Sequence, residues 1–215
     1  MIKTALKVLG SGVLLLGAML LLGLLLTKVL LNGPVGRFDD RIERGLAAHR
    51  TGLGNALTNA GTQLAQPLNV EIALVLLVVL LALLTRRVRP PLYLATLVVG
   101  ESAIYFVAST LIARKRPDVP RLGVGDPIAS YPSGHAAVSI CLYGGLAVLA
   151  WRCTRNRPLQ VGLTALALLI PPLVGFCRMY RGFHHLTDIL AGLVLGGIWL
   201  LVVTRLLLPD ERRTA

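Results

Sequence analysis

The chain has 215 residues, about the length of one domain, and 55% of them are hydrophobic, with a mean hydropathy of +0.73. This composition excludes most soluble folds and favours an integral membrane protein. The formal net charge is +12, but no basic run is interleaved with aromatic residues. We therefore expect the membrane bilayer and an anionic lipid or phosphate as partners, and no nucleic acid.

Six apolar segments are long enough to cross a bilayer, which takes a helix of about 20 residues. The first follows Lys3 and Lys7 and exceeds the apolar region of a typical signal peptide, so we interpret it as a retained anchor. The fifth contains Pro171-Pro172 and is predicted to be kinked or broken there. The expected fold class is all-α, a six-transmembrane-helix bundle in a single integral membrane domain over residues 1–215. The predicted spans cover approximately residues 8–31, 67–84, 92–113, 134–151, 159–176 and 186–208.

One long polar segment, residues 36–66, separates the first two spans. Within it Phe38, Ile42 and Leu46 recur every four residues, as on the apolar face of an interfacial helix. We expect an interfacial helical segment with a solvated, salt-bridged polar face, and a lid or lipid-entry element is the alternative. The charged residues that alternate along it are Asp39, Asp40 and Glu43 with Arg37, Arg41 and Arg44.

Six spans place both termini on one side of the membrane. Lys and Arg, which favour the cytoplasmic side, divide evenly in this arrangement, eleven on each side. Four on the side away from the termini belong to the candidate active site described below, and without them the count is eleven to seven. This indicates a multi-pass protein of the cell membrane with cytoplasmic termini and an active site on the extracytoplasmic face.

Beyond the polar segment, polar side chains concentrate in three clusters that this arrangement brings to one side. Arg114-Lys115-Arg116-Pro117 ends the third span, and Pro132-Ser133-Gly134-His135 opens the fourth. The third cluster runs from Cys177 to Asp188 at the start of the sixth span. Their convergence predicts one functional site.

His184 and Asp188 are four residues apart, so on a helix they share a face. The carboxylate could then accept a hydrogen bond from one imidazole nitrogen and leave the other free to attack. His184 is therefore the candidate nucleophile, and Asp188 its orienting partner.

All three clusters supply groups that bind phosphate. Ser133 and Gly134 precede an apolar helix, where unpaired N–H groups and the helix dipole hold anions, and His135 beside them could exchange a proton. Arg116 and Arg178 carry planar forks that match phosphate oxygens. Together the clusters predict a phosphoryl-transfer site with no cofactor and no metal ion, because the arginines would repel a cation.

At these residues the sequence resembles the type 2 phosphatidic acid phosphatase family. The family pattern is Lys-x6-Arg-Pro, then Pro-Ser-Gly-His, then Ser-Arg-x5-His-x3-Asp, and the three blocks occur here in order. Arg116-Pro117 matches the end of the first block, and Pro132 to His135 match the second completely. Arg178, His184 and Asp188 keep both spacings of the third.

The resemblance implies a histidine-based, metal-independent phosphatase, usually of lipid phosphates. It makes His184 the nucleophile, Asp188 its partner and His135 the acid and base. The phosphate cradle that it implies consists of Arg116, Arg178, Ser133 and Gly134.

Two positions depart from the family pattern. Ser109 stands where the family has Lys, and Cys177 stands where it has Ser. Position 109 shares a helical face with position 116, whereas Arg114 and Lys115 point away from it. These two cations could therefore replace the missing one only if the helix ends before them. Arg114, Lys115 and Cys177 are possible auxiliary residues.

The expected function is that of a lipid phosphate or lipid diphosphate phosphatase acting through a phosphohistidine. Undecaprenyl diphosphate, phosphatidylglycerol phosphate and phosphatidate are candidate substrates. Transfer of the phosphate to another lipid or a sugar, and non-catalytic phospholipid binding, are the alternatives, and the oligomeric state stays open. His185 is interpreted as structural, and Glu101 in the third span as a buried polar contact.

Overall fold

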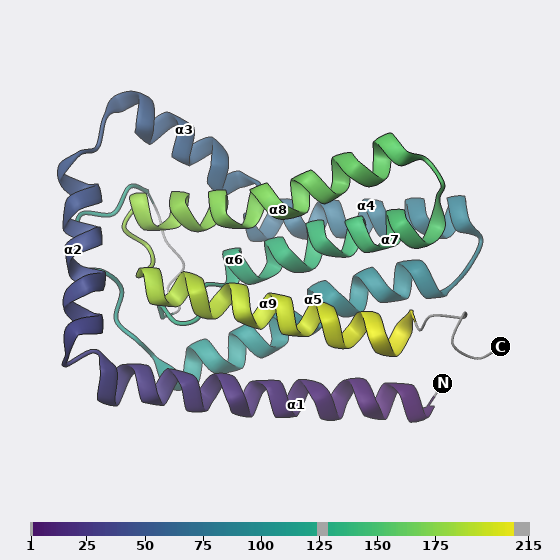
Figure 1. Ribbon diagram of the computed structural model, residues 1–215, viewed down its shortest axis with the longest axis horizontal. Coiled ribbons are helices and arrows are strands. Elements are labelled where there is room, and N and C mark those ends of the chain that lie inside the picture. The colour runs from purple at the N-terminus through teal and green to yellow at the C-terminus, as the bar shows by residue number, and fades with distance from the viewer. Residues whose placement is uncertain (1, 124–128, 209–215) are drawn as a thin grey trace.

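The computed structural model describes residues 2–123 and 129–208, and the described part of the chain contains helices and no strand. Two short segments, Leu26–Leu30 and Ile140–Gly144, are π-helical. The α-helices, labelled in Figure 1, are α1 (Ile2–Leu25), α2 (Pro34–Ala48), α3 (Gly52–Gln63), α4 (Pro67–Thr85), α5 (Arg89–Ile112), α6 (Gly134–Ser139), α7 (Gly145–Cys153), α8 (Arg157–Tyr180) and α9 (Leu186–Leu207).

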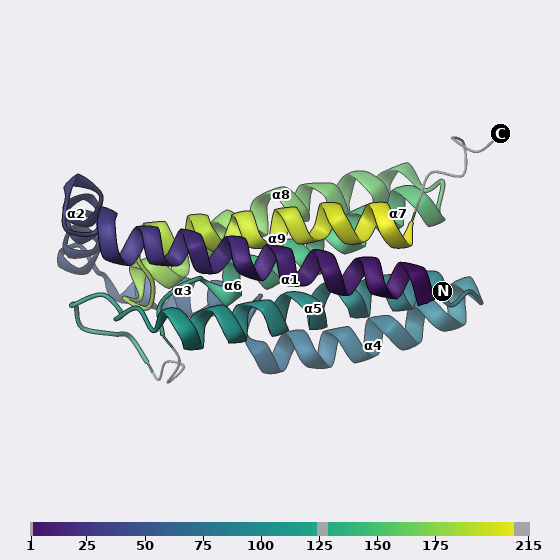
Figure 2. The same cartoon turned by 90° about the horizontal axis from the view of Figure 1, so that it is seen from below.

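Six helical stretches are long and apolar enough to cross a membrane, which confirms the predicted number. They run side by side along the long axis of the molecule, and the first residues of α1 and the last residues of α9 lie at the same end (Figures 1 and 2). Leu83 and Leu168 are each 70% exposed, as expected for side chains that face lipid. The six stretches are Ile2–Leu30, Gly52–Thr85, Arg89–Ile112, Gly134–Cys153, Arg157–Tyr180 and Leu186–Leu207.

The polar segment between the first two spans is helical, as predicted, but its two helices differ in direction. α2 lies across the end of the bundle that is opposite the termini (Figure 1). α3 instead leads back toward α4, and only Leu64, Ala65 and Gln66 separate them. Only α2, the first half of the predicted interfacial segment, therefore lies across the bundle end.

The polar face of α2 is not the solvated, salt-bridged face expected from the sequence. Asp39 and Glu43 are only 1% and 3% exposed, because they point into the bundle end together with Gly36. Asp40 keeps the expected surface pairing, with its Oδ2 3.8 Å from an Arg44 nitrogen. The period-four apolar pattern identified the helix but gave the wrong environment for two of its three acids.

Pro171 and Pro172 do not break the fifth span. α8 runs without interruption from Arg157 to Tyr180 and contains both prolines. In a membrane bundle, neighbouring helices can compensate for the backbone hydrogen bonds that proline removes, and α8 packs against α3, α6 and α7. Of the predicted kink or break, the break is therefore excluded.

Two glycines of α9 that are four residues apart allow α6 to approach closely, since small residues let helix backbones come together. A Cβ atom at Gly192 would collide with the carbonyl oxygen of Ser133, and one at Gly196 with that of Ala137. The close approach fixes the start of the fourth span against the start of the sixth. Two of the predicted clusters are thereby brought together.

Candidate active site

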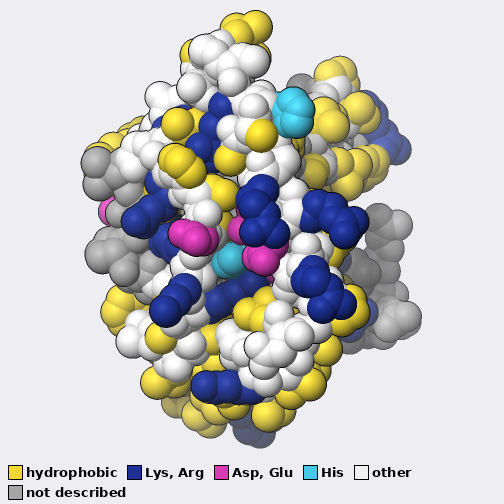
Figure 3. All heavy atoms as spheres, turned by 90° about the vertical axis from the view of Figure 1, so that its left-hand side faces the viewer, with side chains coloured by type: hydrophobic (Ala, Val, Ile, Leu, Met, Phe, Trp, Pro, Cys, Tyr) yellow, Lys and Arg dark blue, Asp and Glu magenta, His cyan; other side chains and the backbone are white. Residues whose placement is uncertain are grey.

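The three polar clusters meet at the bundle end that α2 covers. This face, which Figure 3 views end-on, carries Lys and Arg side chains around a centre of Asp, Glu and His side chains. The main-chain carbonyl of Phe183, in the third cluster, accepts a hydrogen bond from Arg116 of the first at 2.7 Å. The amide of Ser133, in the second cluster, donates to the carbonyl of Asp188 at 3.0 Å. The convergence inferred from the sequence is thus present in the fold.

His184 is held by a main-chain carbonyl that the sequence did not indicate. Its Nδ1 lies 2.7 Å from the carbonyl oxygen of Ser130, and the side chain is 2% exposed. Because a carbonyl oxygen can only accept, Nδ1 must carry a proton. In the neutral ring, Nε2 then holds the lone pair that a nucleophile needs.

Asp188 lies close to His184 but makes no direct hydrogen bond to it, which corrects the expected His–Asp hydrogen bond. Its Oδ2 is 4.0 Å from Nδ1 of His184. α9 begins at Leu186, so His184 lies outside the helix and the assumption of a shared helical face fails. Asp188 instead accepts hydrogen bonds from the Ser130 hydroxyl and from the amide of His185, the latter at 3.0 Å. Asp188 is therefore connected to His184 indirectly, by hydrogen bonds through Ser130.

Arg116 and Arg178 flank one aromatic ring. The guanidinium carbons lie 6.0 Å and 4.2 Å from the ring centroid of Phe183, which is 1% exposed and directly precedes His184. Arg178 also donates to the hydroxyl of Thr62 at 3.3 Å. Two permanent positive charges are thus fixed beside the candidate nucleophile.

These surroundings keep His184 neutral. Burial lowers its pKa well below the usual 6.5, and the nearby charges of Arg178, Arg116 and His135 lower it further. The hydrogen bond to Ser130 acts in the opposite direction but does not offset them. A buried imidazole next to cations is therefore available with its Nε2 unprotonated.

The Pro-Ser-Gly-His segment opens α6 as predicted. Ser133 is its N-cap, with a hydroxyl that accepts from the amide of Ala136 at 3.4 Å. Since the amide of Ser133 is bonded to Asp188, the first helical N–H groups without an intrahelical acceptor belong to Gly134 and His135. The His135 Nε2 lies 3.3 Å from the Gln66 side-chain oxygen, a neighbour that the sequence did not indicate.

The auxiliary residues occupy different places. The helix ends at Ile112, and Ala113 adopts a left-handed conformation (φ 50°). Arg114 therefore lies beyond the helix end, as it must if it is to replace the missing cation. Arg114 turns inward and pairs with Asp188, whereas Lys115 is exposed and contributes its carbonyl to His185 at 3.1 Å.

The two positions that depart from the family pattern are both buried. The hydroxyl of Ser109 donates to the carbonyl of Ala129 at 3.4 Å, so this residue supports the chain next to Ser130 without supplying a charge. Cys177 lies inside α8, where its sulfur fills the space left by Gly61 of α3. It contributes packing between helices.

Glu101, in the middle of α5, is a buried acid of the third span. Glu101 is 1% exposed, and the interaction that the structure gives its carboxylate is with the adjacent Ser102 at 3.4 Å. No group of three or more His, Cys, Asp or Glu side chains within residues 2–123 and 129–208 is arranged to hold a metal ion.

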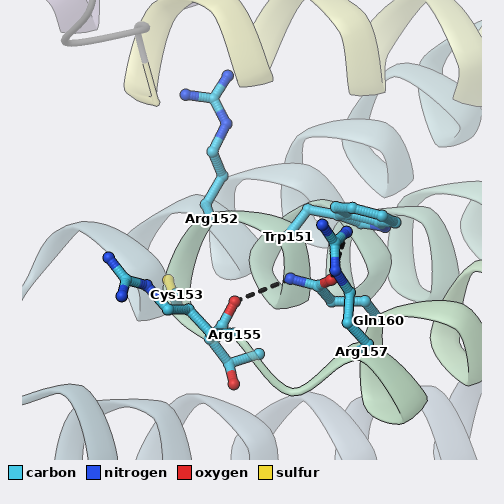
Figure 4. Close-up of a pocket in the computed structure, with 7 residues that line it drawn as sticks. Trp151, Arg152, Cys153, Arg155, Arg157 and Gln160 are labelled. Atoms are coloured by element: carbon cyan, nitrogen blue, oxygen red, sulfur yellow. Dashed lines mark hydrogen bonds between the residues drawn. The ribbon is translucent and has the colours of Figure 1, made fainter.

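A hollow of about 670 Å³ lies at the other end of the bundle, between α7 and α8. Arg157 stacks on Trp151 at 5.2 Å there, while Arg152 extends away from both (Figure 4). Because its cations diverge and it contains no His, this hollow lacks the groups that phosphoryl transfer needs.

Known proteins are similar in sequence to part of this chain. The phosphatidylglycerophosphatase B of Bacillus subtilis is 36% identical over 89 residues, which are 40% of this chain and 42% of that protein. The lipid phosphate phosphatase delta of Arabidopsis thaliana is 37% identical over 81 residues, 35% of this chain and 20% of that protein. The matched part therefore spans less than half the length of either relative.

Solved structures extend the likeness over most of the chain. The transmembrane PAP2 type phosphatidylglycerolphosphate phosphatase of Bacillus subtilis superimposes with a TM-score of 0.77 at 23% identity, over 90% of this chain and 94% of that one. LpxE of Aquifex aeolicus gives 0.57 at 20% identity, over 77% and 93%. The PAP2 superfamily profile matches residues 64–211, which include all three clusters. The chain belongs to the PAP2 superfamily.

Proposed function

We propose that the protein is a membrane-embedded phosphatase that hydrolyses lipid phosphate esters through a phosphohistidine on His184. The observation that carries this proposal is the 2.7 Å contact between Nδ1 of His184 and the Ser130 carbonyl, which places the proton of the neutral ring on Nδ1 and leaves Nε2 unprotonated. Arg116 and Arg178 lie beside it, where they can stabilise the charge of the transferring phosphoryl group.

The reaction has two steps. Nε2 of His184 attacks phosphorus and forms an N–P bond while the P–O bond to the lipid alcohol breaks, and protonated His135 gives its proton to the leaving oxygen. Neutral His135 then takes a proton from water, whose oxygen attacks phosphorus. The N–P bond breaks and inorganic phosphate leaves. Ser133, Gly134, Arg116 and Arg178 hold the phosphate in both steps, and neither step uses a metal ion.

The substrate class follows from membrane burial and from the relatives. Phosphatidylglycerol phosphate is the first substrate to test, because the Bacillus subtilis match by sequence and the Bacillus subtilis match by structure are both phosphatidylglycerophosphatases by name. Phosphatidate and undecaprenyl diphosphate are the other candidates, since the same cradle fits any terminal phosphate.

We also propose that both termini are cytoplasmic and that the active site is extracytoplasmic. Cations at the terminal end of the bundle support this orientation. The carboxylates among residues 2–123 and 129–208 lie at the bundle end covered by α2, near the start of α4 and in the middle of α5, and none of them lies at the terminal end. The cations are Lys3, Lys7, Arg86, Arg87, Arg89, Arg152, Arg155, Arg157 and Arg205.

The test is phosphate release from the three lipids by the purified protein in EDTA. We expect release from at least one lipid, unchanged by EDTA, and loss of activity on the order of 10³-fold or more in His184→Ala. Transfer of label to another lipid or sugar instead of water would favour the phosphotransferase alternative. Lipid binding without turnover would favour the non-catalytic one, and loss of turnover in EDTA would contradict the metal-free reaction.

A further inference from the structure

The crosswise helix α2 turns two of its three acidic residues toward the catalytic loops. Asp39 and Glu43 are four residues apart and almost fully buried, whereas Asp40 is exposed. Burying a carboxylate is costly unless it is paired and hydrogen-bonded. The partners of these two therefore indicate what α2 holds in place.

Asp39 is paired with the arginine that contacts Asp188. Its Oδ2 accepts from Arg114 at 2.9 Å, and Arg114 donates with its other terminal nitrogen to Asp188. The amide of Thr187 donates a hydrogen bond to Asp39 Oδ1 at 3.2 Å, and its hydroxyl donates to Oδ2 at 2.5 Å. The arginine thus bridges a carboxylate of α2 and the carboxylate that holds Ser130.

Glu43 is bonded to the residue that follows the nucleophile. Its Oε1 contacts Nδ1 of His185, and Nε2 of His185 lies 3.1 Å from the carbonyl of Lys115. Since a carboxylate and a carbonyl both accept, both ring nitrogens donate and the imidazole is charged. Burial opposes that charge and Arg114 does so more weakly, but Glu43 and Asp188 outweigh them and raise the pKa of His185.

We propose that Asp39 and Glu43 are positioning residues of the active site, through which α2 sets the geometry of the catalytic loops. Asp39 acts through Arg114 on Asp188 and hence on Ser130. Glu43 acts through His185 on the main chain next to His184. This proposal rests on the phosphatase function proposed above, and it makes turnover depend on how α2 is seated across the bundle end.

The test compares Asp39→Asn and Glu43→Gln with Asp40→Asn in the full-length protein. The matched control removes a carboxylate of the same helix that pairs only at the surface with Arg44. We expect kcat to fall on the order of 10- to 100-fold in the first two variants, because displacement of a reacting group by about 1 Å can cost about 10²-fold. KM should stay within about twofold, since neither carboxylate is part of the phosphate cradle. Asp39→Glu, which keeps the charge, should recover part of the lost kcat.

A second measurement does not depend on turnover. The His185 ring, followed by NMR in histidine-labelled protein, should titrate at lower pH in Glu43→Gln than in the wild type or in Asp40→Asn. Failure of the phosphatase proposal would show as a wild type that releases no phosphate, whereas this titration would still report the contact. An unshifted titration, or a kcat in Asp39→Asn and Glu43→Gln equal to that of Asp40→Asn, would overturn the positioning role.

A milder variant covers the case in which Asp39→Asn does not fold. Thr187→Val has nearly the same shape and removes only the hydroxyl that bonds Asp39 and Arg114. We expect a folded protein, checked by thermal unfolding in detergent, with kcat lowered on the order of 10-fold. Full activity in folded Thr187→Val would equally overturn the proposal.

Discussion

Ser130 connects Asp188 to His184 with two different groups. Its hydroxyl donates to the carboxylate of Asp188, and its main-chain carbonyl accepts from Nδ1 of His184. The side-chain bond fixes the position of the carbonyl, and the carbonyl selects the tautomer of the nucleophile. Asp188 therefore orients the imidazole of His184 indirectly, through Ser130.

Replacing Ser130 with Ala separates these two functions. The variant keeps the carbonyl that holds His184 and loses the hydroxyl bonded to Asp188. Because a hydrogen bond to a charged group contributes about 1.5–3 kcal/mol, we expect kcat to fall on the order of 10- to 100-fold. Steady-state phosphate release measures this, and an unchanged kcat would show that Asp188 acts on His184 by another route.

The lowered pKa of His184 predicts a specific pH dependence. The neutral imidazole attacks, so activity is lost as the pH falls through the pKa of His184, which burial and Arg178 hold well below 6.5. The acid limb of kcat/KM should therefore lie below pH 6.5. In Arg178→Gln the limb should move to higher pH, because one of the charges that lower the pKa is gone. A limb that stays in place would contradict this assignment of the nucleophile.

At the scale of elements, close contact between α6 and α9 fixes the two catalytic segments relative to each other. Gly196 faces the carbonyl of Ala137, while the neighbouring Gly197 has open space where a Cβ would be. Gly196→Ala should push α6 away from α9, lower the melting temperature and reduce kcat on the order of 10-fold. Gly197→Ala is the matched control. Equal behaviour of the two variants would mean that this contact does not position the site.

Hydropathy and short-range spacing predicted the six spans and the three clusters, because both signals lie within single helices or adjacent residues. The contacts that complete the site join residues far apart in the chain. Asp39 meets Arg114 across 75 positions, and His135 meets Gln66 across 69. The spacing of Gly36, Asp39 and Glu43 could have indicated an inward face of α2, but the recurring apolar residues suggested a solvated one.

The His184–Asp188 error has a comparable cause. Four-residue spacing implies contact only inside a helix, and here the helix begins two residues after His184, with Asp188 bonded to the amide of His185 at its N-terminus. Ser130 also lies two residues before Pro132, which opens the second block of the family pattern, and this proximity was the available signal for its role. Helix boundaries, rather than spacing alone, decided which groups meet.

At the scale of the whole molecule, the native cysteines can test the proposed orientation. Cys153 is exposed at the end of α7, on the same end as the termini, whereas Cys141 and Cys177 are buried. A membrane-impermeant maleimide should therefore label Cys153 only after the cells are permeabilised. Asp40→Cys in a Cys153→Ser background should be labelled in intact cells, because Asp40 is exposed at the other end. The reverse pattern would place the active site in the cytoplasm.

The bundle as a whole serves to hold one imidazole, two guanidiniums and a helix start around a phosphate at the membrane boundary. The most direct test of this account is to trap the covalent intermediate. Wild-type protein is mixed briefly with phosphatidylglycerol phosphate that carries radioactive phosphorus in its terminal phosphate, and the reaction is quenched in alkali, where phosphohistidine survives. We predict alkali-stable, acid-labile label on the peptide that contains His184, and none in His184→Ala. Phosphate release without such label, or label that persists in His184→Ala, would contradict the account.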